Sequence, residues 1–147
     1  MIRTSRSGWN WLYIVIAGWA TVIAMAAVPA SWWFEVHRVH VHDGVALMPP
    51  VMEVERTIHY PFRGRWIVTV LRQRKDGRFY TYCTARGVND YQPDNDLPEV
   101  VDLDWWTGWR KCPLPEGRYV VKTLWTIHPQ VLPDKEVRVT SNVFEVR

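Results

Sequence analysis

The segment Arg118–Ile127, with the sequence RYVVKTLWTI, decides the fold class. Tyr119, Val121 and Trp125 recur at even spacing and share one face. A period of two residues is that of a β-strand with one buried face. We expect a strand here, entered through a tight corner at residues 113–117.

Similar signals on both sides of this segment predict further strands. They cover residues 35–42, 52–60, 65–71, 78–85, 99–103 and 136–146. Turn signals at Asp43-Gly44 and at Lys75-Asp76-Gly77 separate neighbouring strands. In the last strand the alternation slips at Ser141-Asn142, which predicts a β-bulge. Residues 87–98 are polar and rich in turn formers, so we expect a long loop there.

The chain therefore contains about seven short strands, a pattern typical of a two-sheet sandwich or a small barrel. No amphipathic helix is evident after residue 35. Residues 105–109, Trp-Trp-Thr-Gly-Trp, read as an aromatic-rich connection rather than as a regular element. The fold class that we expect is all-β.

The corner and the strand after it resemble part of a known fold. Leu114–Tyr119, followed by the alternating strand, is similar to the corner and penultimate strand of immunoglobulin-like domains. In those domains a tyrosine just after the corner bonds back to the backbone, and Tyr119 matches that place. Trp66 resembles their core tryptophan, and residues 141–146 look like their last strand. The resemblance implies an immunoglobulin-like sandwich from residue 35 to the end, but no activity.

The cysteines depart from the immunoglobulin pattern. Cys112 precedes Tyr119 instead of following it, so the usual bond between the sheets is not implied. Cys83 and Cys112 are the only two cysteines, and an oxidising compartment would join them. The bond would close a loop of about 30 residues and add about 3–4 kcal/mol of stability by chain entropy. Two buried free thiols are the alternative.

The N-terminal segment carries no charge from Trp11 to Phe34. At 1.5 Å per residue, about 20 apolar residues cross the hydrocarbon core of a bilayer. Arg3 and Arg6 precede this run and the next basic residue is Arg38, so the positive-inside rule keeps the N-terminus cytoplasmic. We expect a single-pass protein of the cell inner membrane whose C-terminal domain is periplasmic or extracellular.

The domain boundaries follow from this segment. Residues 1–8 form a short cytoplasmic tail, residues 9–34 contact the lipid bilayer as an anchor, and residues 35–147 form the exported domain. A cleaved signal peptide is the alternative, because residues 24–26 and 28–30 fit the small-residue cleavage pattern. The apolar run is longer than the usual h-region of about 7–15 residues, which favours an uncleaved anchor.

Charge gives little support for an anionic partner. The formal net charge is +3, from 18 basic and 15 acidic residues. Arg3 and Arg6 lie before the anchor and supply two of these charges, so the exported part is close to neutral. Nucleic-acid binders carry a basic patch or stripe, so we expect no nucleic-acid partner.

Three residue clusters are candidate binding sites. The first would stack sugar rings on indoles and bond hydroxyls to carboxylates; it comprises Asp102, Asp104, Trp105, Trp106 and Trp109. In the second, His40 and His42 point the same way from a strand and could share a metal ion. The third would hold calcium with the oxygens of Asp90, Asp94, Asn95 and Asp96.

Each cluster also has a structural interpretation. The tryptophans could be core residues or could cover a sheet edge. The histidines could lie on a solvated strand face. The aspartates lack the glycine and distal glutamate of a calcium loop, which favours a solvated loop.

Catalysis has no motif to support it. The sequence contains no Gly-x-Ser-x-Gly, no His-Glu-x-x-His and no phosphate-cradling loop. We expect a non-enzymatic membrane-anchored module without a cofactor, which binds a protein partner in the envelope or supports an envelope assembly. The alternatives are a glycan- or cell-wall-binding module that uses the tryptophan cluster and an exported metal-binding protein.

Overall fold

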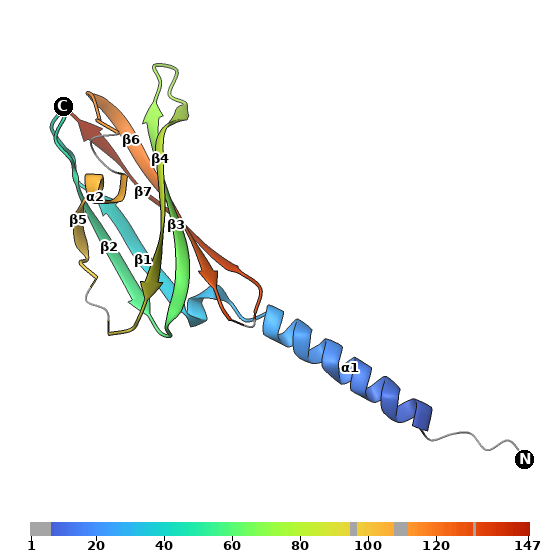
Figure 1. Ribbon diagram of the computed structural model, residues 1–147. Coiled ribbons are helices and arrows are strands. Elements are labelled where there is room, and N and C mark those ends of the chain that lie inside the picture. The colour runs from blue at the N-terminus through green and yellow to red at the C-terminus, as the bar shows by residue number, and fades with distance from the viewer. Residues whose placement is uncertain (1–6, 95–96, 108–111, 131) are drawn as a thin grey trace, which may run out of the picture.

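The computed structural model places the strands in two antiparallel sheets that pack face to face, with one helix projecting from the sandwich (Figure 1). It describes residues 7–94, 97–107, 112–130 and 132–147. Seven strands lie within these residues, so the expected all-β sandwich is confirmed.

The two sheets differ in size. The three-stranded sheet has the order β1-β2-β5, with β1 at Phe34–Val41, β2 at Val51–Ile58 and β5 at Val100–Asp102. The four-stranded sheet has the order β4-β3-β6-β7. Its strands are β3 at Phe62–Gln73, β4 at Phe79–Tyr91, β6 at Gly117–His128 and β7 at Lys135–Val146.

Helix α1 spans Ser7–Ala26 and stands clear of the sandwich (Figure 1). Within it, residues 9–26 have a mean hydropathy of 1.5, and none of them is buried. Twenty residues rise about 30 Å, so by length and composition this helix could cross a membrane. The chain then passes through the short 3₁₀ helix η1 (Ala30–Trp32) into β1. Phe34, expected at the end of the anchor, is instead fully buried in the sandwich.

The core lies between the sheets and is centred on large aromatic side chains of β6. Trp125 is only 1% exposed, and its indole meets the ring of Phe34 edge-on at 5.5 Å between centroids. Trp66, which resembles the core tryptophan of immunoglobulin-like domains, packs against this core without being fully buried. Trp66 lies opposite Trp125 in the register but is only partly buried, because it sits one strand closer to the open edge of the sandwich.

The corner before β6 has the bond expected of it. Tyr119 is fully buried, and its hydroxyl donates to the carbonyl oxygen of Pro115 at 2.6 Å. Burial raises the pKa of Tyr119 to about 12, so this hydroxyl stays protonated and keeps donating at any physiological pH.

The predicted bulge in β7 is confirmed and joins the two sheets. Ser141 and Asn142 together face Val121, whose N–H donates to the Ser141 hydroxyl at 2.9 Å. The bulge turns the Asn142 side chain toward β1. Its Oδ1 accepts from the Val41 N–H at 2.8 Å, and its Nδ2 donates to the Val41 carbonyl at 2.9 Å. Asn142 thus substitutes for a strand partner where β1 and β7 meet.

The expected loop at residues 87–98 is partly wrong, because β4 continues to Tyr91. Gly87 pairs with Trp66, and Tyr91 pairs with Phe62. The rings of Phe62 and Tyr91 stack at 4.7 Å, so aromatic packing outweighs the weak strand preference of Asn89 and Asp90. The connection at 105–109 also differs from expectation, since a short helix, α2, spans Leu103–Thr107.

Replacing Asn142 by alanine tests its bridging role. The substitution removes both bonds to Val41 and leaves backbone groups without partners, so the free energy of unfolding should fall by about 1–3 kcal/mol. Urea unfolding of the full chain in detergent measures this. Thr140→Ala, at an exposed position two residues away on the same strand, should change stability by less than about 0.5 kcal/mol. Equal effects of the two substitutions would contradict the bridge.

Candidate functional site

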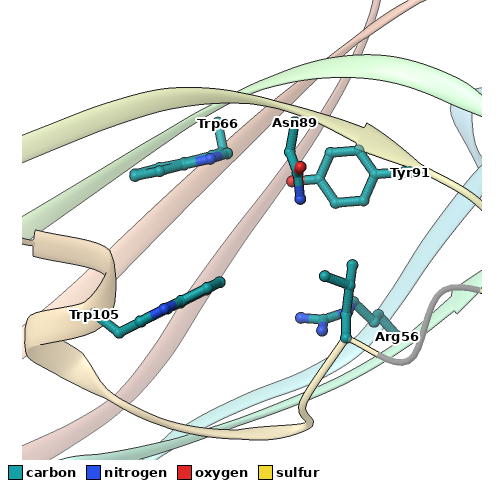
Figure 2. A pocket seen from close by; sticks show the side chains of 6 residues that line it. Arg56, Trp66, Asn89, Tyr91 and Trp105 are labelled. Atoms are coloured by element: carbon teal, nitrogen blue, oxygen red, sulfur yellow. The ribbon is translucent and has the colours of Figure 1, made fainter.

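A small pocket opens at the edge of the sandwich between β2 and β4 (Figure 2). The pocket is formed by β2 of the three-stranded sheet, by β3 and β4 of the four-stranded sheet, by the loop after β4 and by α2. Its lining residues are Arg56, Trp66, Asn89, Tyr91, Leu97 and Trp105. About 20 Å³ of it is open to the centre of a water molecule, which is room for about one water.

One wall of the pocket is the indole of Trp66, which lies flat over Gly87. A Cβ atom at residue 87 would lie 2.4 Å from Cζ2 and 2.6 Å from Cε2 of this indole. Only glycine therefore allows the ring to lie on β4. The opposite face of the ring is turned toward the pocket (Figure 2).

The facing wall is the indole of Trp105, carried by α2 (Figure 2). Trp105 is 63% exposed, whereas Leu103 at the start of the same helix is 2% exposed and donates its N–H to the Pro50 carbonyl at 2.9 Å. The helix is therefore fixed by its first residue, while its tryptophan remains largely on the surface.

The predicted disulfide between Cys83 and Cys112 is present and holds the chain after α2. It joins β4 to a residue that is only 4% exposed. Next to it, the Tyr82 hydroxyl donates to the Pro113 carbonyl at 2.8 Å. The segment that carries Trp105 is thus attached to the sandwich on both sides.

Arg56 supplies a positive charge at the end of the pocket. It occupies an inward position on β2 and donates from Nη2 to the Pro98 carbonyl at 3.0 Å, which is the one hydrogen bond that the described residues give its guanidinium. Burial lowers the pKa of Arg56, and Tyr91 and Glu99 nearby partly offset this. An arginine remains charged at neutral pH, so the pocket holds a partly desolvated cation.

Tyr91 forms the inner wall and is 4% exposed. Burial raises its pKa to about 12, against smaller opposing effects of the nearby Trp125 indole and of the charge on Arg56. With the amide of Asn89 beside it, the pocket combines two indole faces, one cation and two neutral polar groups. Such a set can bind a ring that carries hydrogen-bonding substituents.

Comparison with known proteins adds no relative. No protein-family model matches the chain, and no curated protein matches it significantly. The chemistry of the pocket is therefore the basis for interpreting it.

Among the described side chains of the predicted tryptophan site, one lines this pocket. Trp105 lines it, whereas Asp102 on β5 and Asp104 on α2 do not. The side chain of Trp106 and the whole of Trp109 lie outside the described part of the chain. Sequence reasoning missed the other lining residues, although one signal was available: Arg56 follows Met52 and Val54 on the inward face of β2.

The two histidines of the predicted metal site do share a face. The rings of His40 and His42 meet edge-on with centroids 4.9 Å apart, and His42 Nε2 lies 2.8 Å from Glu53 Oε1. The hydrogen bond from His42 lowers the pKa of Glu53, and Arg38 adds a smaller effect. No cluster of three or more metal-binding side chains occurs among the described residues. The arrangement is that of an exposed ion-pair network.

The aspartates of the predicted calcium site fall on different elements. Asp90 belongs to β4, and its Oδ1 lies 4.0 Å from Nε of Arg63. Asp94 is exposed in the turn that follows β4. Asn95 and Asp96 lie outside the described residues.

Adding a methyl group at Gly87 tests the Trp66 wall. Gly87→Ala should displace the indole and lower the free energy of unfolding by about 1–3 kcal/mol. Urea unfolding with tryptophan emission as the signal measures this. Gly18→Ala is the matched control, because no atom lies within 4 Å of its added carbon.

A second substitution separates the clash from a backbone effect. In Trp66→Leu the indole is absent, so adding Gly87→Ala should lower the free energy of unfolding by less than it does in the natural chain. If the losses of unfolding free energy in the two single variants added up to the loss in the double variant, the indole would not lie over Gly87.

Proposed function

We propose that this protein is a non-enzymatic module that α1 tethers to the inner membrane and that presents an immunoglobulin-like sandwich to a protein partner in the envelope. Three features support the tether: an apolar helix with no buried residue, two arginines before it, and a disulfide in the domain that follows. A disulfide is typical of domains outside the cytosol.

The observation that best supports a protein partner is an apolar loop at the end of the sandwich away from α1. The chain between β1 and β2 exposes Val45, Leu47 and Met48 by 60%, 63% and 62%. Because β1 begins beside α1 and ends at this loop, the loop lies away from the helix, close to the C-terminus (Figure 1). Grouped apolar side chains on a soluble surface are typical of an interaction site.

The backbone of this loop is fixed by neighbouring segments. Gly44 exchanges hydrogen bonds with the end of β7, donating to the Glu145 carbonyl at 2.9 Å and accepting from the Arg147 N–H at 3.0 Å. Leu47 donates to the Leu114 carbonyl at 3.2 Å and has a φ of 64°. This left-handed conformation costs about 1–2 kcal/mol for a residue other than glycine. A loop that is already ordered loses little conformational entropy when a partner binds.

A second candidate function is glycan binding at the pocket. The observation that favours it is the pair of facing indoles, Trp66 and Trp105, at an accessible edge (Figure 2). Indole faces stack on the apolar faces of sugar rings, and Asn89 and Arg56 can bond to hydroxyl groups. The two functions use different surfaces, so they can be tested separately.

Affinity capture from detergent-extracted membranes of cells that express the protein tests the apolar loop. The natural chain should retain one companion at a stoichiometric level. The double variant Leu47→Gly, Met48→Ser should reduce retention of the companion at least about tenfold, because each substitution removes exposed apolar area. Leu47→Gly also relieves the backbone strain at this position. The melting temperature of this variant should therefore not fall.

Val88→Ser is the matched control, because Val88 is 55% exposed on β4, away from the loop. It should retain the companion. Recovery of the protein alone, or equal retention by the loop variant, would contradict the proposed interaction.

A further inference from the structure

We infer that the pocket between Trp66 and Trp105 binds a pyranose ring that carries a carboxylate, as in an acidic glycan. This inference rests on the second candidate function, glycan binding, and names the class of sugar. Three features of the pocket support it: the paired indoles, the partly desolvated guanidinium and the neutral polar groups between them.

The indoles favour a ring over an extended chain. The Trp66 ring lies over Gly87 and turns one face to the pocket, and Trp105 offers a second face opposite (Figure 2). The present space admits about one water, so a sugar ring enters only when Trp105 turns outward. Trp105 is 63% exposed, so the smaller part of its surface has to leave its present contacts in this rotation.

The charge of Arg56 selects the sign of the ligand. Its guanidinium has lost part of its hydration, and among the described residues it makes one hydrogen bond, to the Pro98 carbonyl. A neutral sugar that covers it would withdraw more water from its remaining N–H groups, which costs free energy. A carboxylate instead accepts two parallel N–H bonds from the guanidinium. A cationic ring would be repelled.

The remaining lining groups suit the hydroxyls of a sugar. The Asn89 amide both donates and accepts hydrogen bonds, and the Tyr91 hydroxyl stands beside it on β4 (Figure 2). Neither is charged, so they can bind hydroxyls without competing for the carboxylate. The pocket thus has one anionic subsite and a neutral remainder.

Arg56 has a competing structural role, because it lies on β2 beyond the residues that pair with β5, and an inward charge beside an unpaired strand segment prevents pairing with other chains. The two roles make different demands. A side chain that only prevents pairing with another chain needs a charge, which lysine also supplies. Recognition of a carboxylate uses the planar guanidinium. Arg56→Lys therefore distinguishes them.

Isothermal titration of the full chain in detergent, with tetragalacturonate and the neutral galactotetraose as matched probes, tests the inference. The acidic tetrasaccharide should bind at least about tenfold more tightly at low salt, the ratio expected for one charge-assisted bidentate pair. Raising the salt concentration should reduce this preference. Arg56→Gln should abolish it and Arg56→Lys should reduce it, while binding of the neutral probe persists.

Two tryptophan variants show whether both probes use this pocket. Trp105→Ala should weaken both probes about tenfold, consistent with the stacking of one ring on an aromatic side chain. Trp32→Ala, which removes an indole that is 54% exposed outside the pocket, should leave both unchanged.

The outcomes separate this inference from the function on which it rests. Equal binding of the two probes, with loss in Trp105→Ala, would overturn the acidic preference and leave glycan binding in place. Binding of neither probe would overturn both. An acidic preference that Arg56→Gln leaves intact would also overturn the inference, because Arg56 would not then select the charge.

Discussion

The disulfide between Cys83 and Cys112 is the constraint on which the rest of the account depends. It attaches the segment that follows α2, the helix that carries Trp105, to β4. By chain entropy a loop of this size adds about 3–4 kcal/mol. Such a bond is typical of domains in an oxidising compartment, which is the location that the proposed export would give this domain. By length and composition, the apolar helix α1 could cross a membrane.

The sandwich has two different edges and two different ends. One edge is closed, because Asn142 bonds to both backbone groups of Val41 and Gly44 bonds to the end of β7. The other edge stays open and contains the pocket. One end connects to α1, where Lys135 donates to the Ala26 carbonyl, and the other presents Leu47 and its apolar neighbours. This arrangement places the loop at the end of the sandwich away from α1 and leaves the pocket at the side.

Local patterns predicted the strands well and the pocket poorly. Alternation predicted β6 and the slip at Ser141-Asn142 predicted the bulge, since each depends on neighbours in sequence, while the resemblance to immunoglobulin-like corners implied the Tyr119 bond. The end of β4 was missed because Asn89 and Asp90 are poor strand formers on their own. Their strand forms through aromatic pairing with β3, a contact between distant segments. The role of Gly87 depends likewise on Trp66, which no local pattern places beside it.

The intact mass and thiol state of the protein extracted from membranes test the central claim of export most directly. We predict the full chain of 147 residues and 17.4 kDa, in the membrane fraction, lighter by the two hydrogens lost in the disulfide. A thiol reagent should label it only after reduction. A mass that corresponds to a chain beginning at Ala27 or Ser31 would show cleavage and contradict the anchor. A full-length cytosolic protein with both cysteines labelled without reduction would contradict export itself.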